Sequence, residues 1–488
     1  MATVAAAMAR RTVTTGAAWA LGATTSAPMV VLVGGIVATY AGSEATALPL
    51  LFVLVGAVVT LLLVGYAAMV RAVPHSAPYY AITARGIGPK SGVAAGFVAL
   101  LAYNALQISL YGLFGAIMSG ITGFGAWWFW AAVAIAVVTV LGTRRIVLST
   151  QIVMGVLILS FVVVGLFVVV GFLAPSADGI PTAAFDPAGL SVPGLGLAVA
   201  LTLAAYTGPE GMAAFIEEED SGTGRHGQAI SRGMMWCALT LIVVYTAAAW
   251  ALEAVTGAAE VAAAAGNDPN LPLTILSDKI HPAVGILGTV VLVLAILTSV
   301  ISFHNIINRY AFAMSREQVL PQFLYKTGSG TAADAPVGAS RAQNALAAVV
   351  VLGFALAGAD PQAVLFGWAS TLGAMGLLTL LIIAGAAALR YFARNPGSGE
   401  KGLVTTAAPL FGVAFGIAIL VTMLLKLDEL LGTSSSSLLP YGVPALLIVA
   451  ALAGAGRASA LKRSKPQIFD GISHGVPSVY AVPDRIDL

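Results

Sequence analysis

Charged residues are scarce in this sequence, where Asp, Glu, Lys and Arg together make up 9% of the 488 residues. Soluble globular domains carry roughly 25%, so these charges are too few to cover the surface of a soluble protein of this length. Hydrophobic residues make up 59%, and the mean hydropathy is +0.95. The composition therefore predicts an integral membrane protein.

Cysteine is nearly absent as well. The single Cys237 excludes an intramolecular disulfide, and it lies in an apolar run where a small buried hydrophobe is expected. The sequence also lacks a metal-ligand cluster, a nucleophile elbow and a phosphate-binding loop. We therefore expect no enzymatic activity, no cofactor, no metal site and no nucleic-acid partner.

Long apolar runs dominate the chain instead. A helix that crosses a membrane needs about 20 mostly apolar residues, whereas barrel strands alternate over about ten. The runs here are continuous, which predicts an all-α membrane protein with twelve transmembrane helices. The predicted spans are Gly16–Ala41, Pro49–Val70, Ser91–Gly120, Ala126–Leu141, Leu148–Leu173, Gly194–Ile216, Met234–Val255, Val284–Met314, Asn344–Gly358, Ala363–Phe392, Leu403–Leu425 and Pro440–Gly454.

Lysine and arginine are distributed very unevenly between the two sides that these spans define. If the N-terminus is cytoplasmic, every Lys and Arg except Lys279 and Lys426 falls on the cytoplasmic side. Cytoplasmic loops carry such an excess. The N-terminal segment also lacks the basic, apolar and small order of a cleavable signal peptide. We therefore predict a multi-pass protein of the plasma (inner) membrane with both termini cytoplasmic.

Two of the predicted spans are interrupted in the same way. The first contains Ser26-Ala27-Pro28, and the sixth contains Thr207-Gly208-Pro209. Unwound backbone leaves polar groups that lipid cannot satisfy, so it must be buried in protein or line a watery cavity. Matching interruptions in two halves of a chain point to the binding site of a secondary transporter. A tolerated proline kink is the alternative for each break taken alone.

These stretches resemble the amino acid–polyamine–organocation (APC) transporters. The segment YTGPEGMAAFIEEE, residues 206–219, is similar to the family's sixth helix. The segment LTSVISFHNIINRYAFAMSREQVLPQFL, residues 297–324, resembles its eighth helix and the following loop. The segment VPHSAPYYAITARGIGPKSG, residues 73–92, resembles the loop after the second helix, with Ala77 in place of the usual glycine. After the sixth helix, DSGTGRHGQ replaces the family's basic residue and Asn-Pro.

The resemblance covers nearly the whole chain and implies its organisation. It implies two inverted repeats of five helices with discontinuous first and sixth helices, and two peripheral helices. The parts are a cytoplasmic N-tail (1–15), repeat one (16–173), repeat two (194–392), helices eleven and twelve (403–454) and a cytoplasmic C-tail (455–488). Substrate is expected at mid-membrane between helices one, three, six, eight and ten.

The predicted substrate-binding residues come from these helices. Tyr103, Gln107 and Tyr111 recur every four residues and so share one helical face, which should point inward because polar groups facing lipid are costly. Hydrogen bonding between helices is the alternative role for such groups, and Trp368 is included by analogy with the family. The full set is Thr25, Ser26, Ala27, Pro28, Tyr103, Gln107, Tyr111, Tyr206, Thr207, Gly208 and Trp368.

Glu210 is the acidic residue at the centre of the sixth span. Three roles are open: proton coupling or gating, pairing with a substrate ammonium group, or accepting hydrogen bonds from amides freed by the break. Gly208 and Glu210 match the family's pattern, and the resemblance favours the first role. For a sodium ion, the alternative coupling ion, the candidate ligands are Gly22, Thr298 and Ser299.

The sequence therefore predicts a secondary active transporter, or permease, that moves amino acids across the plasma membrane by alternating access with proton coupling (symport). The alternative within the class is a polyamine or organic-amine transporter or exchanger, with sodium as the coupling ion. A channel or a solute sensor is disfavoured by the broken helices and by the short segment after Arg457. The expected partners are the substrate, H⁺ or Na⁺ and the lipid bilayer, and the oligomeric state stays open.

Overall fold

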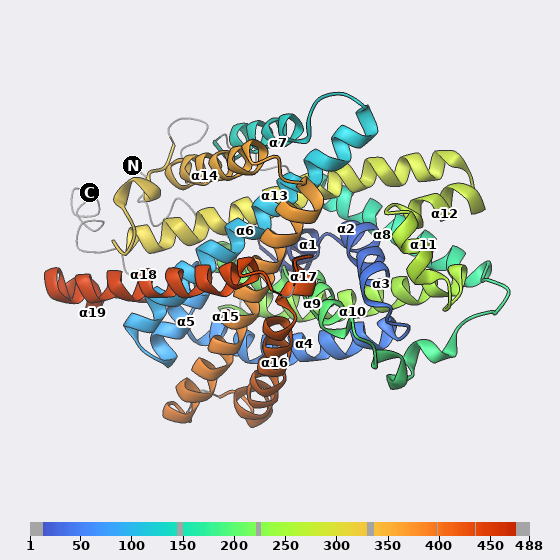
Figure 1. Cartoon of the computed structure of the whole chain (residues 1–488). Coiled ribbons are helices and arrows are strands. Elements are labelled where there is room, and N and C mark those ends of the chain that lie inside the picture. Colours follow the sequence, from blue (N-terminus) through green and yellow to red (C-terminus); the bar gives the residue numbers. More distant parts are fainter. Residues whose placement is uncertain are drawn as a thin grey trace.

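The computed structural model describes residues 13–143, 150–220, 226–328, 336–397, 399–434 and 436–474. Across these ranges the chain is helical and forms no strand, apart from an isolated bridge between Val13 and Glu219. Most of the long helices run across the molecule side by side, as Figure 1 shows. The prediction of an all-α protein is confirmed.

Ten helical segments in the described ranges are long and apolar enough to cross a membrane. They are Thr15–Ser43, Leu48–Ala72, Pro89–Thr122, Ile152–Leu173, Gln228–Thr256, Pro282–Arg316, Val337–Leu356, Pro361–Arg394, Leu403–Leu425 and Leu439–Ser464. The elements within them are α1 (Thr15–Ser26), α2 (Pro28–Val30), η1 (Val31–Ile36), α3 (Val37–Ser43), α4 (Leu48–Ala72), α6 (Pro89–Thr122), α8 (Thr150–Leu173), α10 (Gln228–Thr256), α13 (Pro282–Arg316), α14 (Val337–Leu356), η7 (Pro361–Phe366), α15 (Gly367–Arg394), η8 (Leu403–Ala407), α16 (Ala408–Leu425), η9 (Leu439–Tyr441) and α18 (Gly442–Ser464).

The other two predicted spans are helical but shorter. The fourth is α7 (Trp127–Thr143), which is apolar and at 1.5 Å per residue about 25 Å long. The sixth is divided into α9 (Leu195–Ala205) and η4 (Pro209–Glu218). Neither piece of the sixth span is long enough to cross a membrane alone, because the chain unwinds between them.

Two helix ends differ clearly from the predicted spans. Helix α14 begins at Val337 rather than Asn344, and α18 continues to Ser464 rather than Gly454. Hydropathy detects only the apolar part of a helix, whereas Arg and Lys are good helix formers and extend α18 beyond that part. The first ten residues assigned to the C-tail are therefore helical.

Helix ends collect on two faces of the molecule. We call one the N-terminal face, because α1 begins there beside the end of η4, where Val13 N donates to Glu218 O (3.0 Å). The N-terminal face also carries the end of α13, since Arg316 pairs with Glu217. The opposite face carries the end of α3 and the start of α9, where a side chain on Gly194 would touch Ser43.

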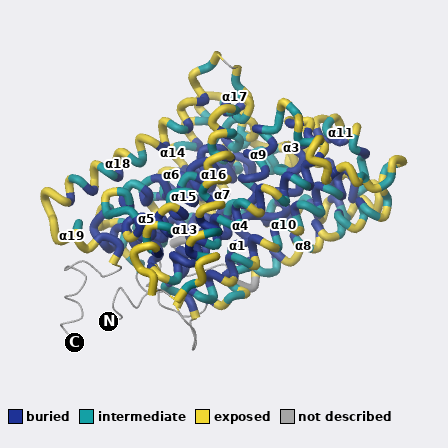
Figure 2. The backbone as a smooth tube through the Cα atoms, turned by 90° about the horizontal axis from the view of Figure 1, so that it is seen from below, coloured by how far each residue is buried: buried dark blue, intermediate teal, exposed yellow. Residues whose placement is uncertain are grey.

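The core lies between the first helical segment, α4, α6, α10 and α13. In the first segment 83% of the most apolar window is buried, against 28% for α16 and 22% for α18, so the last two helices are peripheral. Exposed apolar side chains such as Leu159, Val349, Phe415 and Leu452 cover the outer helices. Figure 2 shows buried backbone in the middle and exposed positions at the periphery. An apolar periphery is typical of a protein surrounded by lipid.

Candidate functional site

Both interrupted helices unwind in the structure. Helix α1 ends at Ser26, Ala27 adopts a left-handed conformation (φ 49°), and Pro28 begins α2. Helix α9 ends at Ala205, and Gly208 takes φ 136° before Pro209 begins η4. Side-chain-bearing residues rarely adopt positive φ, so these two positions hold strained or glycine-specific backbone. The breaks predicted from the sequence are real interruptions, not gentle kinks.

The two breaks contact each other directly. The Ser26 hydroxyl donates to the carbonyl of Thr207 at 2.8 Å. A methyl group added at Gly208 would lie 2.5 Å from Ser26 Oγ and 2.8 Å from its amide nitrogen. Helix α13 joins them, because the Ser299 hydroxyl donates to the Thr25 carbonyl (2.8 Å). Unwound backbone from two distant segments and a hydroxyl of a third helix therefore meet inside the bundle.

Glu210 lies one residue beyond the second break and is buried, with 2% of its surface exposed. Its Oε2 accepts from the Gly208 amide at 2.8 Å. Its Oε1 has no hydrogen-bond partner in the described part of the chain. The Tyr66 hydroxyl donates to its backbone carbonyl (3.2 Å). One carboxylate oxygen thus satisfies an amide freed by the break, while the other is available to a proton or a bound group.

A cavity of about 680 Å³ lies between helix ends at the opposite face. Its walls come from the segment after the first break, the C-terminal end of α6, the start of α13 and α12 (Leu271–Lys279). Representative lining residues are Val30, Val33, Ile117, Leu273, Thr289 and Gln362. Two lining elements, η1 and η7, are wider π-helical turns, which occur frequently at functional sites. The cavity therefore begins just beyond the Ala27–Pro28 break.

A comparison with protein families decides the class of the protein. A family model described as amino acid permease, within the APC superfamily, matches residues 17–451. No curated protein matches the chain. The chain belongs to the amino acid permease family. It is accordingly a multi-pass membrane protein whose family points to a transporter rather than an enzyme.

Three predicted binding residues of this permease lie on α6, and one of them, Gln107, bonds to helices other than the broken ones. Gln107 donates to the Val300 carbonyl (3.3 Å) and to the Tyr111 hydroxyl (3.4 Å), and it accepts from Gln343 of α14. The Tyr103 ring packs 6.0 Å from the ring of Tyr310. Gln107 therefore joins α6 to α13 and α14, whereas Tyr111 bonds to Gln107 within α6.

Two further predicted residues also bond away from the breaks. The Tyr206 hydroxyl donates to the Phe52 carbonyl of α4 (2.7 Å). The Trp368 indole donates to the Leu431 carbonyl (3.0 Å), just after α17 (Leu427–Leu430). The hydroxyls of Ser26 and Ser299 bond where the breaks meet, whereas the Thr25 hydroxyl donates to the Leu21 carbonyl of its own helix (2.7 Å).

The candidate sodium ligands of the permease are divided in the same way. The Gly22 carbonyl lies at the break, 3.0 Å from where a Gly208 side chain would begin. Ser299 bonds there too, but the Thr298 hydroxyl donates to Leu294 and Ala295 of its own helix, each at 3.0 Å. Within the described ranges, no three His, Cys, Asp or Glu side chains gather that could hold a metal ion.

Ion pairs at the N-terminal face of the permease are features that the sequence did not reveal as pairs. Arg316 makes two bonds to Glu217 (2.7 and 3.2 Å), and Arg309 bonds to Glu218 (2.6 Å) while covering the Phe215 ring (4.0 Å to its centre). The seven-residue spacing of the two arginines, one face of α13, was the available signal.

Glu253 is a second buried acid that sequence reasoning missed, although it falls in the predicted seventh span. It accepts from the Tyr40 hydroxyl of α3 at 3.1 Å, and its other oxygen has no partner among the described residues. It lies near the C-terminal end of α10, close to the opposite face. Glu253 is therefore a buried carboxylate remote from the breaks, whereas Glu210 lies beside them.

Proposed function

We propose that this permease is a secondary active transporter that carries amino acids across the plasma membrane by alternating access. The observation that supports this most strongly is the contact between the two unwound segments, made by Ser26 and Thr207. Free backbone amides and carbonyls at helix ends suit the carboxylate and ammonium groups of an amino acid. Thr25, Ala27, Pro28 and their counterparts in the second break would then surround the substrate.

The proposed topology has twelve spans, with α7 as the fourth and α9 with η4 as the sixth. Residues 16–173 and 194–392 form the two inverted repeats, and α16 and α18 are peripheral, which their low burial supports. The N-terminal face is proposed to be cytoplasmic. The sequence supports this orientation, because twelve such spans assign every Lys and Arg except Lys279 and Lys426 to the cytoplasmic side.

The arrangement of contacts corresponds to one state of an alternating-access cycle. The pairs Glu217–Arg316 and Glu218–Arg309 hold η4 against α13 at the N-terminal face. The cavity at the opposite face reaches toward the Ala27–Pro28 break. We infer that this state is closed to the cytoplasm and accessible from outside. A ten-residue 3₁₀ helix such as η4 is unusually long and is suited to a hinge.

Proton coupling is proposed to reside at Glu210. The support is a buried carboxylate directly beside the breaks, with one oxygen that has no partner among the described residues. A charge there is costly, so a proton that arrives or leaves would change the stability of the surrounding structure. A polyamine or organic-amine substrate, paired with Glu210, and a sodium ion near Gly22 and Ser299 are the competing proposals.

The test is transport by the purified permease in liposomes, with Glu210→Gln and Glu260→Gln compared. Glu260 is exposed and serves as the matched control. Counterflow of a labelled amino acid establishes a carrier, since a channel or a sensor cannot exchange. We expect Glu210→Gln to retain counterflow but lose accumulation driven by a pH gradient, and the control to retain both.

Other outcomes identify the competing roles. A collapse of substrate affinity in Glu210→Gln would assign the residue as a counter-charge for an amine. Normal pH-driven accumulation would leave it a structural acceptor. Accumulation that requires a sodium gradient at fixed pH would replace the proton with Na⁺. Absence of counterflow for all amino acids and amines in the wild-type protein would contradict the transporter proposal itself.

A further inference from the structure

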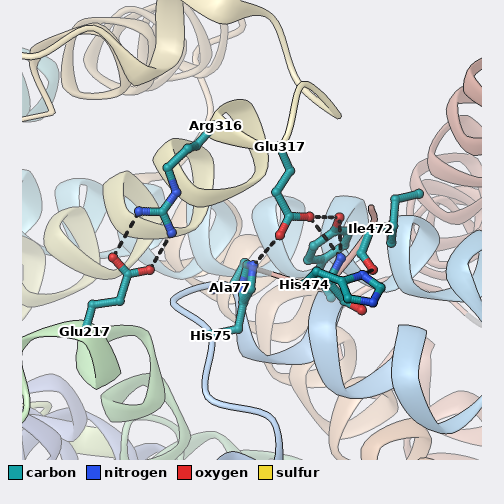
Figure 3. A network of polar contacts seen from close by, with 9 residues as sticks. His75, Ala77, Glu217, Arg316, Glu317, Ile472 and His474 are labelled. Carbon is teal, nitrogen blue, oxygen red and sulfur yellow. Dashed lines mark hydrogen bonds and ion pairs between the residues drawn. The ribbon is translucent and has the colours of Figure 1, made fainter. Parts of the chain in front are cut away.

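Two consecutive residues at the end of α13 contact different parts of the protein, as Figure 3 shows. Arg316 reaches η4 and pairs with Glu217. Glu317 points to the other side, where its Oε1 lies 2.9 Å from His75 Nε2, in the loop that follows α4. Its Oε2 accepts from the Tyr80 hydroxyl of α5 (Pro78–Gly86) and from the amide of Ser473 at 3.0 Å. The pair with Glu217 and the contacts of Glu317 are therefore connected through the single peptide bond between Arg316 and Glu317.

Ser473 belongs to the segment that follows the last long helix. Helix α18 is followed by α19 (Pro466–Asp470), and the chain then turns inward, so that Ile472 and Ser473 are 2% and 5% exposed. Ser473 adopts φ 69°, which is unfavourable for a residue with a side chain. Surrounding contacts must hold this conformation, and its amide bonds to Glu317 and to Tyr80 Oη (3.3 Å) are such contacts.

A second attachment comes from α18 itself. Arg457 donates to the carbonyls of Val319 (2.9 Å) and Gln318 (3.1 Å), in the turn that ends α13. Gln318 also has a left-handed backbone, with φ 59°. Charge-assisted bonds to carbonyls are stronger than neutral ones. The turn after Arg316 is therefore held by two separate groups of the C-terminal region.

We propose that Arg457 and the segment Lys465–Ser473 form a brace that positions Arg316 against Glu217, and so determines how firmly the N-terminal face of the permease closes. The physical basis is preorganisation, because a bidentate guanidinium–carboxylate pair needs a defined geometry. A turn fixed on both sides presents Arg316 in that geometry, whereas a free turn would lose it to conformational entropy. The inference rests on the proposed function only in treating this closure as a step of transport.

A simple anchor for the last helix is the competing explanation, and hydrogen exchange of the full-length protein in detergent separates the two. Ser473→Pro removes the amide donor and cannot adopt the native φ. Ser473→Gly keeps the donor and tolerates positive φ, so it is the matched control. We expect exchange in η4 (Pro209–Glu218) to become about tenfold faster in Ser473→Pro and to stay unchanged in Ser473→Gly.

A second pair of variants tests the brace without changing position 473, so that misfolding of Ser473→Pro does not decide the result. Arg457→Gln removes the donors to the turn, and Arg463→Gln alters an exposed arginine on the same helix. We expect Arg457→Gln to accelerate exchange in η4 and Arg463→Gln to leave it unchanged. Combining Ser473→Pro with Arg316→Gln should add nothing to the effect of Arg316→Gln alone, because both act on one pair.

Acceleration confined to α19 and the turn at 317–321, with η4 unchanged in both variants, would overturn the brace and leave only an anchor. Additive effects of Ser473→Pro and Arg316→Gln would overturn it as well, since the segment would then act on η4 by another route. The measurement needs no substrate. Its result is therefore independent of the counterflow experiment that tests transport.

Discussion

Gly208 is the residue whose backbone decides the shape of the second break. Its φ of 136° is accessible to glycine, and its Cα faces Ser26 so closely that no side chain fits between them. Backbone contact of this kind brings the amides and carbonyls of both breaks within reach of one small ligand. The chemistry that we propose for the permease therefore depends on the missing side chain of Gly208 as much as on the side chains nearby.

Gly208→Ala should separate the two breaks. The added methyl group meets Ser26 and requires strained backbone, so we expect a loss of about 1–3 kcal/mol in folding free energy and loss of counterflow. Gly353→Ala on α14 is the control, because no described atom outside its own helix backbone lies within 4 Å of the new methyl group. Thermal unfolding and counterflow are the measurements. Unimpaired counterflow by Gly208→Ala would show that the break contact is dispensable.

Glu317 makes a pH-dependent contribution outside the membrane-spanning segments. Burial by itself would raise its pKa, but the charge of His75 and bonds from His75, Tyr80 and Ser473 hold the pKa below its usual range. A depressed carboxyl pKa adds stability above the unfolded-state pKa of about 4.3, and that stability disappears as pH falls toward the folded pKa.

We therefore expect Glu317→Gln to unfold at a lower temperature than the wild-type protein at pH 7, with the difference shrinking below about pH 4 as the wild-type carboxylate becomes protonated. Removing one partner of a buried pair costs about 3–5 kcal/mol, so the difference at pH 7 should be large. Thermal unfolding in detergent at both pH values measures it. A difference that grows as pH falls would contradict this assignment.

At the scale of elements, η4 connects the site to the N-terminal face. Glu210 lies in its first turn beside the breaks, and Glu217 and Glu218 end it against α13. Because the hydrogen-bond geometry of a 3₁₀ helix is poor, the position of η4 depends on what holds its ends. Changes in either end can therefore move the whole element.

The Arg309–Glu218 pair offers a direct test of that dependence. Both side chains are mostly buried, at 14% and 18% exposed, so we expect a coupling energy of at least about 1 kcal/mol in a double-mutant cycle of Arg309→Gln and Glu218→Gln. The Lys426–Glu429 pair is 38% and 36% exposed and should show a much weaker coupling, because solvent screens exposed ion pairs. Thermal unfolding of each cycle gives the comparison, and equal couplings would mean that η4 is not held by this pair.

At the scale of the whole molecule, the two faces differ in what they hold. Ion pairs between η4 and α13 lie at the N-terminal face, and a cavity lies at the other. A transporter must expose its site to one side at a time, so the two faces should be closed alternately. The distribution of Lys and Arg predicts that the N-terminal face meets the cytoplasm.

Cysteine labelling of intact cells tests that orientation. In a Cys237→Ala background, single cysteines replace Ser436, between α16 and α18, and Ser464, at the end of α18. Both positions are exposed. An impermeant thiol reagent should label the cysteine at 436 from outside, and the one at 464 only after the cells are permeabilised. Labelling of position 464 in intact cells would reverse the topology.

The sequence by itself determined the class of the protein, the helical spans and the two breaks. Lipid leaves a spanning chain few ways to satisfy its backbone, so continuous apolar runs predict helices directly. The interruptions are also local, since Pro28, Pro209 and Gly208 limit the helix wherever the chain folds. The sequence misplaced the start of α14 and the end of α18, because hydropathy does not detect the polar residues that continue a helix.

Only the tertiary structure decided which side chains meet. Gln107 and Tyr206 are both buried, yet their partners are Gln343 and Phe52, far away in the sequence. The contact of Ser473 with Glu317 is equally remote along the chain. No periodicity encodes such pairs, because each depends on how whole helices pack and rotate against one another. The pairing of acids and arginines at the N-terminal face arises from that packing.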